Sequence, residues 1–492
     1  MRTLQAIILA AGEGTRMKSD MPKVLHRICG RPMIAYALDL AASAGVKQPI
    51  IILGAGAEAV QPHLPKEAKV VIQTKRLGTG DAVVAAKKAL GSHGSVLILY
   101  ADTPLLRRGT IQKLIEAHFK TEATATLLTA HLADPSGYGR ILRNEQGQIV
   151  GIVEEAEAAA AQRAIREINV GPLVCKVEAL LQALATITPS ASKHELYLTT
   201  AISAIAKQEG TKIHATRVEE IAEALGINSK AELARAIGVI RQRIIDMHLN
   251  NGVTIEDPRS TFIDQGVSIG ADTVVHPYTV IETSVAIGKR CSIGPFARLR
   301  SGVSIADESR VGNFVELVRA KVGHRVRIGH VTYLGDATVE DDVNIGAGTV
   351  TANYDGSEKH PTHIGKGAFI GSDTVLIAPV KIGPGAVTGA GCVVTKGHDV
   401  PAKGVVAGVP AKPFEQAKAA STDGHPHPAA GKRPVLRRAP AKAKRPAKRA
   451  LRPARRPSVK KARPAVRRPA AKRTVARRPA AKRPARRVLA RR

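Results

Sequence analysis

Residues 268–299 read SIGADTVVHPYTVIETSVAIGKRCSIGPFARL, and an aliphatic residue returns at every sixth position. An α-helix and an alternating strand have shorter periods, so neither explains this spacing. A hexapeptide repeat is typical of a parallel β-helix, whose short strands each contribute one inward aliphatic side chain to a continuous core. The expected inward positions are Ile269, Val275, Ile281, Ile287, Ile293, Leu299, Ile305, Val311 and Leu317.

The repeat slips after Leu317, resumes at Val322, and is interrupted again at residues 353–363. We expect a left-handed parallel β-helix over residues 250–414. Its flat faces favour a homotrimer. A purely structural solenoid remains the alternative, although loops that interrupt such a repeat usually lie on a binding face.

The preceding part alternates short apolar runs with helix-like segments, which indicates a Rossmann-like α/β domain over residues 1–226. The apolar runs are residues 6–11, 50–53, 70–72, 96–100 and 126–129, and the helical segments include 33–44 and 110–119. A linker helix is expected at 227–249, where Ser229 and Glu232 form a capping-box pattern. Its apolar positions, three or four residues apart, are Leu233, Ile237, Ile240, Ile244 and Met247.

The net charge of +33 is concentrated at the end of the chain. Residues 431–492 contain 27 Lys and Arg and no Asp or Glu, whereas the rest has 47 basic and 41 acidic residues. We expect residues 415–492, rich in Lys, Arg, Ala and Pro, to be disordered. Such a tail would bind nucleic acid or another polyanion by neutralising phosphates, without base stacking because it lacks aromatic residues. A merely solvated tail is the alternative.

The four cysteines are far apart and form no CxxC pair, which argues against a zinc site and a disulfide framework. The chain shows no secretory signal and no run of 18 apolar residues. We therefore expect a cytoplasmic protein without a membrane span.

Residues 9–17, LAAGEGTRM, follow the first predicted strand. Glycine lets backbone N–H groups approach an anion and the following helix start adds its dipole, so phosphate is the natural ligand. A tight structural turn would explain the two glycines equally well, but Arg16 and Lys23 favour phosphate. Residues 73–82, QTKRLGTGDA, offer an amide and a second glycine-rich segment suited to a base edge. Asp102 ends a buried strand, where a carboxylate can hold a divalent cation or cap the next helix.

Six motifs in order then point to one family. They are LAAGEGTRM, PKVLH at 22–26, LGTG at 77–80, GYGR at 137–140, IVE at 152–154 and EIN at 167–169. Over residues 5 to 412 the chain resembles the bacterial bifunctional N-acetylglucosamine-1-phosphate uridyltransferases/glucosamine-1-phosphate acetyltransferases. The resemblance implies that glucosamine 1-phosphate is acetylated from acetyl-CoA. UMP from UTP is then joined to N-acetylglucosamine 1-phosphate, with Mg²⁺ as cofactor, to give UDP-N-acetylglucosamine and pyrophosphate.

The resemblance also implies site residues. The nucleotide would contact Leu9, Ala10, Gly12, Arg16, Lys23, Gln73, Gly78 and Thr79, and the sugar would contact Gly139, Glu154 and Asn169. Mg²⁺ would be held by Asp102 and Asn228, and Asn228 would also contact the substrate. In the solenoid, His330 would be the catalytic base, because histidine titrates near neutral pH. Glucosamine 1-phosphate would contact Arg300, Tyr333, Asn344 and Lys359, and acetyl-CoA would contact Ala347, Asn353, Tyr354, Ser372 and Ala390.

Three positions depart from the family pattern. Val318 replaces a lysine that contacts the sugar phosphate, Gly408 replaces an arginine on the CoA side, and Ala101 replaces a glycine before the metal-binding aspartate. Arg319 could substitute for the first and Lys412 for the second. Two alternatives remain open: a uridyltransferase whose solenoid serves only assembly, and a nucleic-acid-binding protein that contains a relic enzyme.

Overall fold

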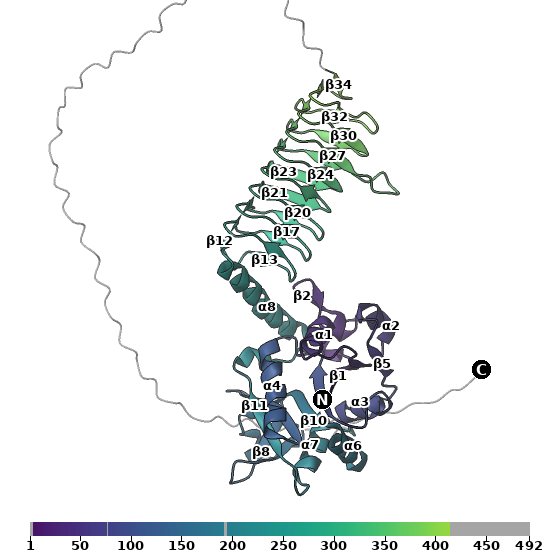
Figure 1. Ribbon diagram of the computed structural model, residues 1–492, viewed down its shortest axis with the longest axis vertical. Helices are drawn as coiled ribbons and strands as arrows, with labels where there is room; N and C mark the ends of the chain where they lie inside the picture. Colours follow the sequence, from purple (N-terminus) through teal and green to yellow (C-terminus); the bar gives the residue numbers. More distant parts are fainter. Residues whose placement is uncertain (1–2, 76, 191–193, 414–492) are drawn as a thin grey trace, which may run out of the picture. The chain divides into compact units, whose positions relative to one another are not determined.

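The computed structural model describes residues 3–75, 77–190 and 194–413. The tail predicted for residues 415–492 lies outside the described residues. In the described part, a mixed sheet with its helices comes first, followed by one long helix and a solenoid of short strands (Figure 1).

The first sheet has nine strands in the order β11-β7-β10-β6-β1-β4-β5, with the β8–β9 hairpin beside β10. Strands β4, β1 and β6 are parallel, whereas β10 runs antiparallel to β6 and β7. Along β1, Ala6 and Ile8 pack into one core and Ile7 and Leu9 into another, as expected for a sheet covered on both faces. The strands are β1 (Leu4–Ala10), β4 (Ile50–Leu53), β5 (Lys69–Ile72), β6 (Ser95–Tyr100), β7 (Ala125–His131), β8 (Arg140–Arg143), β9 (Ile149–Val153), β10 (Glu167–Lys176) and β11 (Ile213–Arg217).

Helices surround this sheet, and one small hairpin contacts α1 and the long linker helix. The helices are α1 (Ile34–Ser43), α2 (Ala57–Val60), α3 (Thr79–Ala85), α4 (Arg108–Thr121), α5 (Ala160–Arg163), α6 (Val177–Thr186) and α7 (Leu198–Ala206), and the hairpin is β2 (Arg27–Ile28) with β3 (Arg31–Pro32). Because β1 and β6 are neighbouring parallel strands, the loops that follow them meet at one edge of the sheet.

The linker helix α8 runs from Lys230 to Asn250. Ser229 Oγ accepts the Glu232 N–H at 3.3 Å, and Glu232 Oε2 accepts the backbone N–H of Asn228 at 2.7 Å. Most of the predicted apolar positions are buried, whereas Met247 is 47% exposed. Toward the end of the helix the buried face is formed instead by Ile245 and His248, which are 0% and 2% exposed.

The solenoid is a left-handed parallel β-helix, as predicted. Val274 pairs in parallel with Ser292, and Ser292 with Arg310, so these positions are equally spaced and three six-residue units complete each coil. All of the predicted inward aliphatic residues are at most 9% exposed, which confirms the six-residue reading. The strands from the start of the solenoid are β12 (Thr254–Ile255), β13 (Phe262–Ile263), β14 (Ser268–Ile269), β15 (Val274–Val275), β16 (Val280–Ile281), β17 (Ala286–Ile287), β18 (Ser292–Ile293), β19 (Arg298–Leu299), β20 (Ser304–Ile305), β21 (Arg310–Val318), β22 (Lys321–Val322) and β23 (Arg327–Gly335). They continue with β24 (Ala337–Val339), β25 (Asn344–Ile345), β26 (Val350–Ala352), β27 (Thr362–Ile364), β28 (Phe369–Ile370), β29 (Val375–Ile377), β30 (Val380–Ile382), β31 (Val387–Thr388), β32 (Val393–Val394), β33 (Val405–Ala407) and β34 (Lys412–Pro413).

Changes in coil length explain both irregularities of the repeat. Arg310 pairs with Arg327 and Arg327 with Asn344, so these two coils are equal in length and one residue shorter than the coils before Arg310. Asn344 then pairs with Phe369, which makes the following coil the longest of the series. The extra residues lie between β26 and β27, where Tyr354 and Lys359 form an antiparallel bridge.

Candidate functional site

The glycine-rich loop connects β1 to a short 3-10 helix, Thr15–Met17. Gly14 has φ 67°, and a Cβ there would lie 2.7 Å from Lys23 Cβ, so glycine permits both the turn and the close approach of the lysine. A Cβ on Gly12, in contrast, would meet no described atom within 4 Å. The structural turn thus explains Gly14, whereas Gly12 is open to a ligand.

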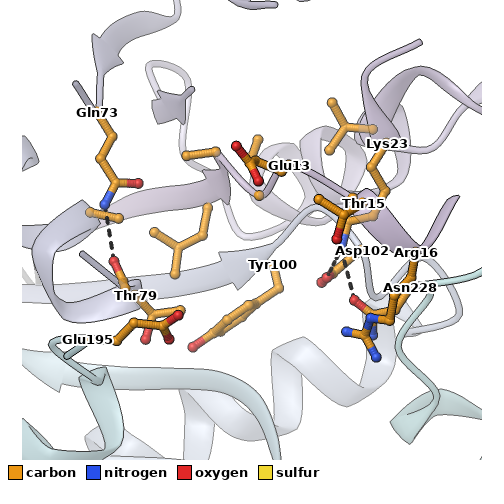
Figure 2. Close-up of a pocket in the computed structure, with 18 residues that line it drawn as sticks. Glu13, Thr15, Arg16, Lys23, Gln73, Thr79, Tyr100, Asp102, Glu195 and Asn228 are labelled. Atoms are coloured by element: carbon orange, nitrogen blue, oxygen red, sulfur yellow. Dashed lines mark hydrogen bonds and ion pairs between the residues drawn. The ribbon is translucent and has the colours of Figure 1, made fainter. Parts of the chain in front are cut away.

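A cavity of about 480 Å³ opens over this loop. Figure 2 shows Gln73, Thr79 and Glu195 at one end, Lys23, Asp102 and Asn228 at the other, and Tyr100 between them. The lining includes every residue predicted to contact the nucleotide or the metal: Leu9, Ala10, Gly12, Arg16, Lys23, Gln73, Gly78, Thr79, Asp102 and Asn228.

The end with Gln73 is held by a tight glycine turn. Gln73 Nε2 donates to Gly78 O at 3.1 Å and to Asp81 Oδ2 at 2.7 Å. Gly78 has φ 104°, and a Cβ there would lie 2.6 Å from Leu196 O. The two donors of the Gln73 amide are therefore used to fix the turn, and its carbonyl oxygen is the atom left to accept from a ligand.

Lys23 lies at the other end, between the two predicted metal ligands. Its Nζ is 2.5 Å from Asp102 Oδ2 and 3.2 Å from Asn228 Oδ1 (Figure 2). The Ile227 N–H donates to Asp102 O at 2.9 Å, and Glu232 fixes the backbone of Asn228. One carboxylate and one amide oxygen thus converge with an ammonium group.

This donor set fits magnesium bound together with a triphosphate. Among the described residues no group of three or more His, Cys, Asp or Glu side chains is arranged to hold a metal ion. Mg²⁺ is commonly held by one or two protein oxygens, while substrate phosphates and water complete its octahedron. Asp102 and Asn228 provide that small number of oxygens.

The three predicted sugar contacts lie together beside the cavity rather than in its lining. The Asn169 N–H donates to Gly139 O at 2.9 Å, and a Cβ on Gly139 would be 3.6 Å from both carboxylate oxygens of Glu154. Tyr100 lines the cavity, and burial, followed by the negative charge of Glu154, raises the pKa of its hydroxyl. Thr199 Oγ1 donates to Glu154 Oε1 at 2.7 Å and orients the carboxylate.

On the β-helix, His330 lies at a corner where Phe314 and Val331 have φ values of 56° and 43°. Its ring Nδ1 is hydrogen-bonded to Oδ1 of Asn313, its register partner on β21. Strand register puts small residues at the same position of the next four coils, and most of them are exposed. We call this strip the small-residue column: Ala347, Ser372, Ala390 and Gly408.

The next corner, where Arg319 and Asp336 have φ values of 48° and 51°, gathers most of the other predicted residues. Asn353 Nδ2 donates to Asp336 Oδ2 at 2.5 Å. Gly335 leaves room for its neighbours, since a Cβ there would lie 2.6 Å from the Tyr333 hydroxyl and 2.7 Å from Asn353 Nδ2. The predicted residues at or beside this Asp336 corner are Arg300, Tyr333, Asn353, Tyr354 and Lys359, whereas Asn344 lies on the His330 side.

Two family models match the chain. The MobA-like NTP transferase domain covers residues 6–197, and the bacterial transferase hexapeptide (six repeats) covers residues 266–301 and 361–396. A relative from Heliobacterium modesticaldum called bifunctional protein GlmU is 43% identical over 436 residues, covering 82% of this chain and 94% of the relative. Proteins of the same name from Pelotomaculum thermopropionicum and Caldanaerobacter subterraneus are 43% and 40% identical, covering 77% and 82% of this chain and 90% and 94% of the relatives.

The chain belongs to the GlmU family. Membership confirms the predicted bifunctional enzyme, a uridyltransferase and acetyltransferase built from a nucleotidyltransferase domain and a hexapeptide-repeat domain. In the part of the chain that the structure describes, no helix combines the length and the apolar character needed to cross a membrane.

The departures of this GlmU family member now have structural explanations. Val318 is buried, and Arg319 binds Asp336 through Nε and Nη2, at 2.5 and 2.7 Å, so part of its guanidinium group is already paired and its substitution for the lysine stays a prediction. This ion pair also lowers the pKa of Asp336. Lys412 is exposed beside the end of the small-residue column and is available there. Ala101 is buried and donates its N–H to Leu9 O at 3.0 Å, so the added methyl group lies in the core.

Among the residues that the sequence did not single out, Tyr100 and Glu195 line the cavity and Asn313 contacts His330. Tyr100 reads as one more apolar residue of a buried strand. Glu195 reaches the cavity only through the packing of its neighbour Leu196 against Gly78, for which no local pattern exists. Asn313 had a usable signal, because it occupies the position of His330 in the preceding coil.

Proposed function

We propose that the cavity of the α/β domain binds UTP and N-acetylglucosamine 1-phosphate, and that the β-helix corners bind glucosamine 1-phosphate and acetyl-CoA. Acetylation comes first and uridyl transfer second. The product is UDP-N-acetylglucosamine, with release of pyrophosphate.

In the uridyl transfer, a phosphate oxygen of the sugar attacks the α-phosphorus of UTP in line, and pyrophosphate leaves from the opposite side. No side-chain nucleophile is needed, so the chain mainly positions the reactants and neutralises charge. Lys23 and Arg16 face the triphosphate, and the Gln73 carbonyl oxygen accepts a base N–H. Glu154, Asn169 and the Gly139 backbone hold the sugar.

Asp102 and Asn228 would hold Mg²⁺, which supplies a positive charge that draws the phosphates together. Lys23, which bonds to both side chains, keeps them oriented toward the triphosphate side of the cavity. The observation that carries this proposal is that ten residues from separate segments, all chosen from the sequence, line one cavity.

The test is Asp102→Asn. Pyrophosphate release from UTP should fall by about 100-fold or more, because removing one group that stabilises charge in the transition state costs that much in other enzymes. Thiol release from acetyl-CoA should not change, and Asp20→Asn, at an exposed aspartate of the same region, is the matched control. Unchanged pyrophosphate release by Asp102→Asn would reject the assignment.

In the acetyl transfer, the amine nitrogen of glucosamine 1-phosphate attacks the thioester carbon of acetyl-CoA. Nε2 of His330 takes the proton that the amine loses, the C–S bond breaks, and the thiolate leaves with a proton returned from the imidazolium. The small-residue column extends straight from His330 along the coils. It offers an unobstructed strip for the extended arm of acetyl-CoA.

We further propose a homotrimer with acetyl-transfer sites between copies. The His330 and Asp336 corners are separated by five residues of β23, about 16 Å of extended strand, which is longer than a hexosamine phosphate. A corner from a second copy would close the gap. Co-expression tests this directly, since His330→Ala and Lys359→Ala, each inactive alone, should restore acetyl transfer when mixed. No restoration, with monomers in sedimentation, would reject the trimer.

The buried Val318 and the ion pair of Arg319 make the acetyl-transfer site of the β-helix the one to test directly. Pyrophosphate release without thiol release from acetyl-CoA and glucosamine 1-phosphate would overturn its assignment. Polyanion binding by the tail stays a separate prediction. The full chain should retard DNA at low salt, while a chain ending at Phe414 should not.

A further inference from the structure

The Asn313–His330 hydrogen bond selects the tautomer of the neutral histidine ring. Asn313 presents its carbonyl oxygen, Oδ1, to His330 Nδ1. A carbonyl oxygen only accepts, so Nδ1 must be the ring nitrogen that bears hydrogen. In neutral imidazole the lone pair then lies on Nε2, and only that atom can act as a base.

The backbone holds these two side chains in register. Asn313 and His330 are direct partners of β21 and β23, and the glycine before each of them brings the coils together. A Cβ on Gly312 would lie 1.9 Å from Gly329 O, so no larger residue fits at that position without separating the coils. Thr332 Oγ1 donates to His330 O at 2.7 Å and ties down the chain after the corner.

The nearby carboxylates are paired elsewhere. Glu316 Oε1 lies 2.7 Å from Arg300 Nε, and Asp336 is bound by Arg319 and Asn353. The group that orients His330 is therefore a neutral amide rather than a carboxylate. Its carbonyl oxygen sets the ring tautomer by accepting from Nδ1.

We propose that Asn313 is a positioning residue for acetyl transfer. It holds the His330 ring with Nδ1 protonated and Nε2 directed to the substrate amine. This inference rests on the proposed role of His330 as the base. The amine proton goes to Nε2 as the N–C bond forms, and the same proton leaves Nε2 for the CoA sulfur as the C–S bond breaks; Nδ1 keeps its hydrogen throughout.

Three substitutions test the proposal in the full-length chain. Asn313→Leu removes the acceptor. Because general-base catalysis contributes about 10²- to 10⁴-fold, kcat for thiol release should fall about 10- to 100-fold. KM for acetyl-CoA should stay within about twofold of its original value. Asn313→Asp keeps an oxygen acceptor and should retain kcat within about threefold. Thr338→Leu, at an exposed position of another face, is the matched control and should have no effect.

Uridyl transfer by the same molecules reports on folding and should not change in any variant. If Asn313→Leu keeps the original kcat, or if Asn313→Asp fails to rescue it, Asn313 is not a positioning residue. His330→Ala separates this failure from that of the proposed function. Full thiol release by His330→Ala would overturn the base itself, whereas an inactive His330→Ala beside a fully active Asn313→Leu would overturn only the present inference.

Discussion

Replacing Gly78 with alanine should strain the turn that forms one end of the nucleotide cavity. Gly78 has φ 104° and ψ −178°, a conformation that costs other residues about 1–3 kcal/mol. The added Cβ would lie 2.6 Å from Leu196 O, so this segment must move and the 2.7 Å hydrogen bond from the Gly80 N–H to Leu196 O is lost. That bond contributes about 1 kcal/mol, which brings the total to about 2–4 kcal/mol.

The turn can be restored on binding only if UTP supplies this free energy. In the pyrophosphate-release assay, kcat/KM for UTP should therefore fall at least about 30-fold, the equivalent of about 2 kcal/mol. Gly147→Ala is the matched control, because Gly147 also has positive φ, 77°, but a Cβ there would meet no described atom within 4 Å. Acetyl transfer by both variants reports on folding. Equal kcat/KM values for Gly78→Ala and Gly147→Ala would refute the reasoning.

Lys23→Met should lower kcat for uridyl transfer by about 100- to 1000-fold, because it removes the ammonium beside Asp102 and the triphosphate, whereas Lys18→Met, at an exposed position, should not. Burial lowers the pKa of His118 from 6.5 to about 4, so the folded chain resists a proton that the unfolded chain accepts. The contribution of neutral His118 to the free energy of unfolding is fully present above pH 6.5 and decreases by roughly 3 kcal/mol as the pH falls toward 4. His118→Gln should reduce that loss, measured by urea unfolding followed by circular dichroism of the helices. Ile281→Ala, at a fully buried inward position, should destabilise the solenoid by about 2–5 kcal/mol and Ile281→Val by about 1 kcal/mol, measured as loss of acetyl transfer in urea.

The solenoid was predictable because one local rule determines it. Each inward aliphatic, such as Val275 or Ile293, is buried whatever the rest of the chain does, since its neighbours above and below come from the same repeat. The sequence also revealed where the period failed after Leu317. It did not reveal that a coil one residue short closes as well as a regular one, because coil closure depends on how the corners bend.

The nucleotide cavity was predictable only in part. Glycines and cations that follow a strand indicate a phosphate site, and Gly12 and Lys23 both line the cavity. Glu195 could not be found in this way, because its place depends on a contact between segments far apart in the sequence. Arg319 shows the same limit of sequence-based prediction, since only the structure reveals that its guanidinium group is paired with Asp336.

Coils of three different lengths stack in the same column without disturbing one another's strand pairing. Each turn bonds only to the turns directly above and below, so an insertion or deletion at a corner stays where it occurs. An insertion can therefore lengthen one loop, or a deletion shorten one coil, without changing how the other coils of the β-helix stack. The loop between β26 and β27 can therefore vary in length while the small-residue column stays in register from coil to coil.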